Sequence, residues 1–137
     1  MERVRAHPMA EHLESGEIAE RKAQKFLEKQ GLHLLASNYS CRYGELDLVM
    51  CDEEHLVVVE IRYRRQTGFM KPAESITRAK RDRIARSTLH FMQRSAGYRN
   101  HPVRFDVISV FGPLERLTMD WLPGAFTMED TRVNWHA

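Results

Sequence analysis

The sequence predicts an α/β protein in which helices flank a mixed β-sheet. Two stretches, about 9–30 and 75–96, carry apolar residues at the three- and four-residue spacings of amphipathic helices. Short runs of β-branched and apolar residues, typical of strands, lie between and after them. The second helix separates the third and fourth of these runs, where it can form the crossover that parallel strands require. The expected order of elements is α-β-β-β-α-β-β.

The bulk composition is typical of a soluble globular protein. The chain has 137 residues, of which 42% are hydrophobic and 29% charged, enough for one domain with its own core. We expect residues 1–122 to form this domain and residues 123–137, which lack a clear period, to form a C-terminal tail. No apolar run approaches the roughly 20 residues needed to cross a membrane, and the first residues lack the apolar core of a signal peptide. We therefore expect a cytoplasmic protein without a membrane partner.

The first helix should end at Gly31, because glycine readily takes the left-handed conformation of a C-terminal cap. Glu20 lies on its inward stripe, among Leu13, Gly16, Ala23 and Leu27. This glutamate either marks a partly exposed edge of the stripe or leans over the end of the sheet.

The remaining elements follow from turn signals between apolar runs. A strand over 32–38 should lead into a turn at 41–44, and the sequence Asn100-His101-Pro102 should end the second helix. Two further strands are expected over 103–111 and 116–122, joined by a turn that contains Gly112 and Pro113.

Two of the predicted strands carry carboxylates within apolar patterns, in Gly44–Val49 and Val57–Arg62. If residues 52–55 form a four-residue loop, Cys51 faces Leu56 and the register is fixed along both strands. That register sets three pairs opposite one another: Val49 and Val58, Asp47 and Glu60, and Glu45 and Arg62.

The opposed carboxylates of Asp47 and Glu60 need an explanation. Like charges about 5 Å apart are unfavourable unless something positive lies between them. A hard cation such as Mg²⁺ typically takes one or two protein carboxylates and leaves its other positions to water and substrate phosphate. The alternative is that these are solvent-facing charges and that Glu45 and Arg62 form a simple cross-strand salt bridge.

A strongly basic block follows Glu60. Residues 62–99 carry 11 Lys and Arg against 2 Asp and Glu, whereas residues 1–61 carry 7 against 12. Such a block is the electrostatic footprint of a surface that contacts phosphates, although a solvated helix face can have the same composition. The candidate nucleic-acid contacts are Arg64, Arg65, Arg78 and Lys80.

Most of the chain, about residues 16–122, resembles the uncharacterised YraN (UPF0102) family. The resemblance rests on the segments Gly44-Glu45-Leu46-Asp47-Leu48, Val59-Glu60-Ile61-Arg62-Tyr63-Arg64 and Arg104-Phe105-Asp106-Val107, on Gly16, Glu20, Ala23, Leu27 and Gly31 of the first helix, and on Asn38, Ser75 and Lys80. The fold of that family is similar to Holliday junction resolvases and to PD-(D/E)xK nucleases of the restriction-endonuclease type.

The resemblance implies an αβββαβ core and a Mg²⁺-dependent endonuclease, with Mn²⁺ as an alternative ion. Carried over, the catalytic residues are Glu20, Asp47, Glu60 and Arg62, and the metal ligands are Asp47, Glu60 and Glu20. The implied reaction is hydrolysis of phosphodiester bonds in DNA, including branched DNA. The metal would activate water and neutralise charge in the transition state. A homodimer would be consistent with cutting two strands.

The chain departs from the nuclease pattern at Arg62, which replaces the lysine of Glu-x-Lys. Arginine stays charged and offers a planar fork for phosphate, so it stabilises charge but does not act as a base. Two alternatives to an enzyme follow. One is a catalytically silent nucleic-acid-binding protein on a nuclease-like fold, and the other is a protein-interaction adaptor with an incidental basic helix.

Arg104 and Asp106 share a strand face two residues apart. A structural ion pair between them is favoured over metal chemistry. Trp121 could stack on a base, but a role in the core is favoured.

Overall fold

The computed structural model describes residues 8–64 and 76–134. Within these ranges the chain forms two α-helices, five β-strands and three short 3₁₀ helices. In chain order they are α1 (Pro8–Lys29), β1 (His33–Cys41), β2 (Gly44–Cys51), β3 (Leu56–Arg64), α2 (Arg78–Arg94), η2 (Ala96–Tyr98), β4 (Val103–Phe111), η3 (Leu114–Arg116), β5 (Thr118–Phe126) and η4 (Met128–Asp130).

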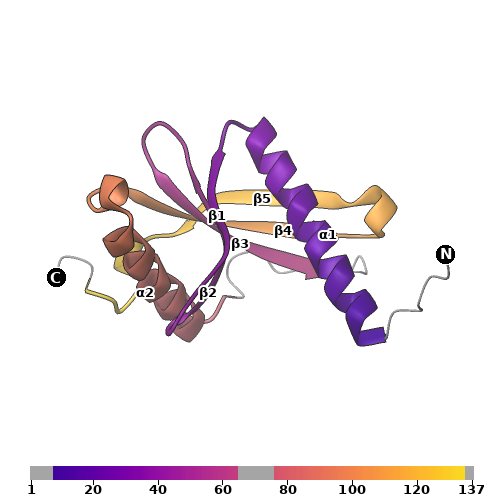
Figure 1. The fold of residues 1–137 in the computed structure, drawn as a ribbon, viewed down its shortest axis with the longest axis horizontal. Coiled ribbons are helices and arrows are strands. Elements are labelled where there is room, and N and C mark those ends of the chain that lie inside the picture. Colours follow the sequence, from indigo (N-terminus) through magenta and orange to yellow (C-terminus); the bar gives the residue numbers. More distant parts are fainter. Residues whose placement is uncertain (1–7, 65–75, 135–137) are drawn as a thin grey trace.

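The strands form one mixed sheet in the order β1-β2-β3-β4-β5 (Figure 1). Neighbouring strands are antiparallel except β3 and β4, which are parallel and are joined through α2. The predicted α/β class, with the αβββαβ order of a nuclease-like core, is confirmed. None of the helices in the described part of the chain is both long enough and apolar enough to cross a membrane.

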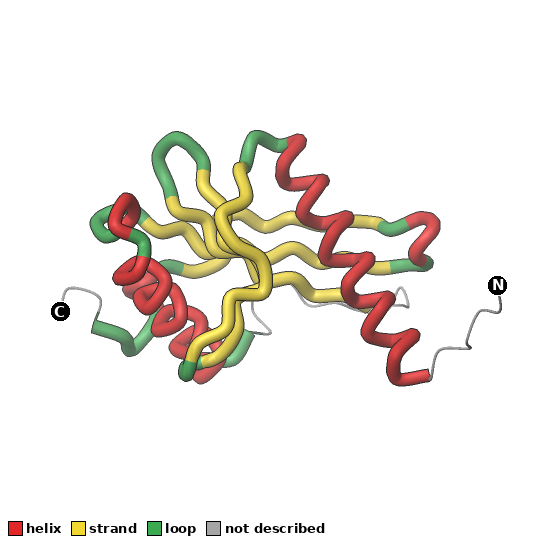
Figure 2. The backbone as a smooth tube through the Cα atoms, in the orientation of Figure 1, coloured by secondary structure: helices red, strands yellow, loops and turns green. Residues whose placement is uncertain are grey.

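The two helices cover opposite faces of the sheet (Figure 2). Strand β3 is buried on both faces, as expected for a central strand. Its residues alternate: Val57 and Val59 pack with α1, whereas Val58 packs with α2. The α1 cluster includes Ala19, Ala23, Leu27, Leu48, Met50, Ile108 and Val110, and the α2 cluster includes Leu46, Val49, Ile84, Ala85, Phe91, Phe105 and Val107.

The helix ends follow from local chemistry. Gly31, with φ of 100°, lies just beyond the end of α1, as predicted. The helix α2 begins at Arg78 because the Thr77 hydroxyl accepts a hydrogen bond from the Lys80 backbone N–H at 3.2 Å, which caps the first turn. The expected start at Ser75 lies outside the described residues. Strand β1 runs on to Cys41, three residues beyond the expected end at Asn38.

The C-terminal part of the fold differs from the prediction. Strand β5 occupies Thr118–Phe126 instead of 116–122, so the expected boundary with the tail falls inside a strand. Phe126 and Met128 are buried in the α2 cluster. The pairing of β5 with β4 shifts register near Gly124. A bulge of this kind on an edge strand accommodates Pro123 and Gly124, which read as breakers in the sequence.

Candidate functional site

The predicted register between β2 and β3 is confirmed up to the carboxylates. Cys51 pairs with Leu56 and Val49 with Val58, but the ladder ends at Leu48 and Val59. Beyond that point a side chain takes the place of a backbone acceptor: Oδ2 of Asp47 accepts a hydrogen bond from the backbone N–H of Ile61 at 2.8 Å. The two strands therefore separate next to Asp47.

The separation coincides with a bend in the neighbouring hairpin. Asn38 of β1, which lies across from Asp47, has φ of 51° in the left-handed region. Asparagine is one of the few non-glycine residues that adopts this conformation readily. Beyond the bend, Leu46 joins the α2 cluster although Leu48 belongs to the α1 cluster. Glu45 consequently pairs with Ser40 of β1, not with Arg62 as the continued register predicted.

The side chains of Asp47 and Glu60 nevertheless interact directly, as predicted. Burial of the Asp47 carboxyl and the negative charge of Glu60 together raise the pKa of Asp47 to about 8, and the hydrogen bond from Ile61 opposes this rise only in part. At neutral pH the pair therefore favours holding a proton unless a cation replaces it.

Lys80 supplies a positive charge at the same point. Its Nζ lies 2.6 Å from Oε1 of Glu60, whose side chain is only 11% exposed, while 44% of the Lys80 side chain is exposed. The lysine belongs to the first turn of α2 and the glutamate to the centre of the sheet. The ammonium group is thus bound to Glu60 of the pair, while part of the Lys80 side chain stays exposed to solvent.

Glu20 lies beside this pair, on α1. It is half-buried, and it shares a hollow with Ser37, Asn38 and Leu48. Burial raises the pKa of Glu20, and a hydrogen bond with the Asn38 side chain acts against that rise. The charges of Glu45, Glu17 and Glu60 also raise it. The structure therefore brings Glu20 into the electrostatic field of the pair.

The donor set suits a hard cation bound by two protein ligands. Among the described residues, no three His, Cys, Asp or Glu side chains are grouped closely enough to hold a metal ion together. Asp47 and Glu60 do form a close pair of carboxyls, of which Glu60 is buried and Asp47 half-buried. Mg²⁺ often binds through one or two carboxylates and keeps several waters, so this pair fits Mg²⁺ or Mn²⁺.

The predicted phosphate-binding residues that the structure describes lie on β3 and α2, the same two elements as Glu60 and Lys80. Arg62 is half-buried on β3, two residues after Glu60 and across from Ser109 of β4. Arg64 is exposed at the end of β3, and Arg78 is exposed at the start of α2. Arg65 lies outside the described residues. Two exposed arginines therefore flank Lys80 and Arg62.

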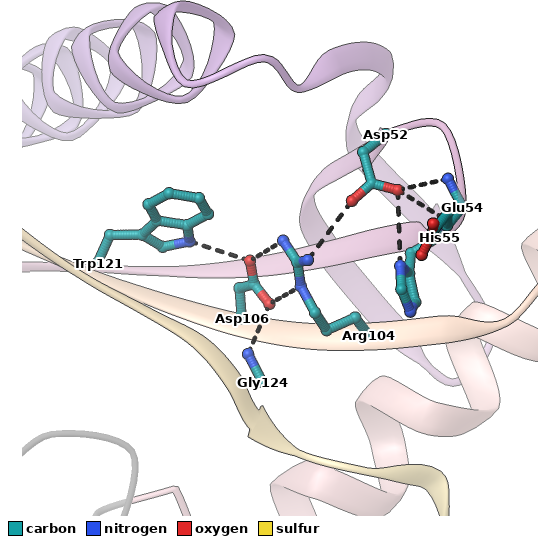
Figure 3. Close-up of polar contacts among 7 residues, drawn as sticks. All are labelled: Asp52, Glu54, His55, Arg104, Asp106, Trp121 and Gly124. Atoms are coloured by element: carbon teal, nitrogen blue, oxygen red, sulfur yellow. Dashed lines mark hydrogen bonds and ion pairs between the residues drawn. The ribbon is translucent and has the colours of Figure 1, made fainter.

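Asp106 takes no part in this arrangement, since it is the centre of a separate buried network (Figure 3). Arg104 binds both of its carboxylate oxygens, at 2.9 and 3.1 Å. The Trp121 indole N–H and the Gly124 backbone N–H each donate to it at 2.9 Å. Arg104 also reaches Asp52 in the β2–β3 loop. The predicted structural ion pair is confirmed, and Trp121 is part of the same network.

Sequence reasoning underestimated two residues of the site. Lys80 was expected to bind a phosphate, but in the structure it also forms an ion pair with Glu60. The one sequence signal for this ion pair was the absence of a lysine at position 62. Asn38 was not given a role, although it bonds Glu20 and bends the hairpin. Its signal was an asparagine inside a strand pattern, where asparagine is uncommon.

Comparison with known proteins gives one consistent result. The family model described as "Uncharacterised protein family UPF0102" matches residues 19–110. A UPF0102 protein of Nitrosococcus oceani is 42% identical over 120 residues, covering 88% of this chain and 97% of that protein. A UPF0102 protein of Pseudomonas fluorescens is 43% identical, covering 87% and 98%. A third, of Saccharophagus degradans, is 38% identical, covering 89% and 100%.

Proposed function

The chain belongs to the uncharacterised protein family UPF0102, and we propose that it is a Mg²⁺-dependent endonuclease that hydrolyses phosphodiester bonds in DNA. One observation carries the proposal: the half-buried carboxyl of Asp47 and the buried carboxyl of Glu60 meet where two strands separate, with the Lys80 ammonium 2.6 Å from Glu60. Perturbed carboxyls with a specific charged partner are typical of catalytic sites. Exposed arginines beside them supply the charge that a polyanionic substrate requires.

Asp47 and Glu60 would hold the ion, with Mn²⁺ as a substitute for Mg²⁺, and Glu20 would add negative charge from α1. When bound, such an ion lowers the pKa of a water molecule and neutralises charge on the reacting phosphate. The hydrogen bond from Ile61 fixes the orientation of the Asp47 carboxylate. That orientation is set by the backbone, so it is already established before substrate arrives.

Lys80 and Arg62 together take the roles that the single lysine of the Glu-x-Lys motif has in nucleases. Lys80 holds Glu60 in place and turns its solvent side toward a phosphate. A lysine ammonium can also donate a proton and its neutral amine can accept one, whereas arginine keeps its charge. Arg62, on the strand of Glu60, offers its planar fork to two phosphate oxygens. The replacement of lysine by arginine at position 62 is thus compatible with catalysis.

The path of DNA follows from the exposed basic residues. Arg64 and Arg78 flank the carboxylate pair at the end of β3 and the start of α2, so phosphates on either side of the scissile one would meet them. Cutting both strands of a junction would use two copies of the site, which is consistent with a homodimer.

The proposal is tested by cleavage of a labelled four-way DNA junction with and without Mg²⁺. Asp47→Asn and Glu60→Gln keep the shape of the side chains but remove a charge, and each should lower the rate at least about 100-fold. Asp120→Asn, on the exposed face of β5, is the matched control and should cleave as wild type does. Equal Mg²⁺-dependent rates in wild type and Asp47→Asn would overturn the proposal.

The second candidate is a catalytically silent nucleic-acid-binding protein. The ion pair between Lys80 and Glu60 favours it, because this pair neutralises Glu60 without any metal. Salt-dependent DNA binding that is equal in wild type and Asp47→Asn, together with no cleavage under Mg²⁺ or Mn²⁺, would identify this function.

A further inference from the structure

An exposed guanidinium covers an aromatic ring at the tip of the β1–β2 hairpin. Arg42 and Tyr43 form the two-residue turn between Cys41 and Gly44. The Cζ atom of Arg42 lies 4.8 Å from the centre of the Tyr43 ring, and Nη2 of Arg42 donates to the Tyr43 hydroxyl at 2.6 Å. Among the described residues, Arg42 has no carboxylate partner. The turn therefore presents a cation and a flat ring together at the surface.

The tip is supported from below by α2. The Tyr43 ring meets the His90 ring edge-on, with centres 6.4 Å apart. The Tyr39 hydroxyl lies 2.5 Å from Nδ1 of His90, which fixes the imidazole. A Cβ atom at Gly44 would lie 3.8 Å from the Ser87 hydroxyl, so the hairpin backbone lies directly on the helix. These contacts from α2 hold the ring in one position, while Arg42 lies over one of its faces.

The tip and the carboxylate pair lie at two ends of the same seam between β2 and α2. Lys80, Arg83, Ser87 and His90 follow one another at spacings of three and four along one side of α2. Lys80 contacts Glu60, whereas His90 contacts Tyr43. At 1.5 Å per residue the two ends are about 15 Å apart.

The length of β2 gives a similar distance between the tip and the carboxylate pair. Four residues of extended chain separate Asp47 from Tyr43, which is about 13 Å. Arg83 is exposed between the two ends of the seam, and Arg86 is exposed one turn before His90. The space between the carboxylate pair and the tip is therefore bordered by positive charge, and its length of about 13–15 Å accommodates a few nucleotides.

We propose that the Arg42–Tyr43 tip is a stacking site for an unpaired DNA base, a few nucleotides from the phosphate at the carboxylate pair. The inference rests on the proposed function, and it narrows the substrate to DNA with a single-stranded segment beside the cleaved bond. An aromatic face accepts any base, and an adjacent arginine adds cation–π attraction and phosphate contact. In an intact duplex the bases are stacked on one another, and the tip finds no free face to bind.

The experiment compares two labelled probes, a single strand of about 20 nucleotides and a blunt duplex of the same length, by fluorescence anisotropy with Ca²⁺ in place of Mg²⁺. Arg42→Ala and Tyr43→Ala should each weaken binding of the single strand about tenfold and binding of the duplex less than twofold. Tyr43→Phe keeps the ring and should bind the single strand nearly as wild type does. Arg116→Ala, on the exposed surface of η3, removes an arginine far from the tip and should change neither probe.

The outcomes separate this inference from the proposed function. Equal losses on both probes, or no loss with either tip variant, would overturn the stacking site while leaving cleavage by wild type unaffected. A selective loss for the single strand in a protein that never cleaves DNA would retain the stacking site and exclude the nuclease. Wild type that binds neither probe would overturn both. Because Arg42 is exposed, Arg42→Ala keeps the test valid if Tyr43→Ala fails to fold.

Discussion

Lys80 places its ammonium nitrogen 2.6 Å from the Glu60 carboxylate, although one residue lies on a helix and the other in the middle of the sheet. Asp47, which touches the same glutamate, has its pKa raised by burial and by the Glu60 charge. The lysine therefore neutralises Glu60, whereas Asp47 accepts a hydrogen bond from the uncharged backbone N–H of Ile61. A carboxylate pair with too little positive charge is a site that gains stability from a further cation.

Removal of the lysine charge should destabilise the fold. We expect Lys80→Met to lower the free energy of unfolding by about 1 kcal/mol at neutral pH, because Glu60 stays buried without its partner. The loss should be larger at pH 8 than at pH 5, because Asp47, whose pKa is raised to about 8, ionises more at higher pH and adds its negative charge beside Glu60. Urea unfolding measures this, with Lys29→Met at the exposed end of α1 as the control. Equal losses in the two variants would mean that the ion pair contributes nothing.

The raised pKa of Asp47 predicts a pH-dependent stability. A carboxyl with a folded pKa of about 8 and an ordinary value of 3.8 binds more protons in the folded state than in the unfolded state. Its contribution to stability is therefore present below about pH 4 and is lost as the pH rises toward 8.

Asp47→Asn mimics the protonated carboxyl and should abolish this loss. Relative to wild type, the variant should become more stable by at least about 1 kcal/mol between pH 5 and pH 8. Urea unfolding at both pH values, in buffer without divalent ions, checks the difference. Asp120→Asn should follow wild type at both. A constant difference between Asp47→Asn and wild type would show that Asp47 titrates normally.

Divalent ions should stabilise the wild-type fold through the same pair. An ion at 100 times its dissociation constant adds about 2.7 kcal/mol to the free energy of unfolding. We expect Mg²⁺ or Mn²⁺ to raise the thermal midpoint of wild type by several degrees, and to have little effect on Asp47→Asn or Glu60→Gln. Calorimetric titration of wild type should show binding that both variants lose. An equal rise in all three proteins would indicate ions bound elsewhere.

Much of this site could be predicted from the sequence, because strand register is a local property. The four-residue loop fixed Cys51 opposite Leu56, and that register brought Asp47 toward Glu60. The insertion of Asp47 into the ladder could not be predicted, since it depends on the backbone of Asn38 in another strand. The contact of Lys80 also depends on how α2 returns to the sheet, which no short-range pattern encodes.

The C-terminal segment also differs from the prediction because of contacts between residues that are distant in the sequence. Residues 123–137 lack a clear period, and this indicated that the domain ends at residue 122, just before Pro123 and Gly124. An edge strand tolerates a residue without a backbone N–H and absorbs extra residues in a bulge. Phe126 therefore still reaches the core, where its ring stacks on Phe105 with centres 4.6 Å apart. The burial of Phe126 extends the domain beyond residue 122, and this burial depends on residues that are distant in the sequence.

The Asp106 network provides a final prediction that concerns stability alone. Asp106 is 1% exposed and accepts hydrogen bonds from Arg104, Trp121 and Gly124. Asp106→Ala would leave these donors without their acceptor, and it should cost about 3–5 kcal/mol. Arg104→Met removes a charge from the same pair and should also destabilise, since the Asp106 carboxylate then stays buried without a cation.

Urea unfolding measures both losses, and the metal response separates this network from the carboxylate pair. Where the Asp106→Ala protein remains folded, Mg²⁺ should still raise its thermal midpoint, because Asp47 and Glu60 are unchanged. A folded Asp106→Ala protein that no longer responds to Mg²⁺ would connect Asp106 to the metal site and contradict its purely structural role.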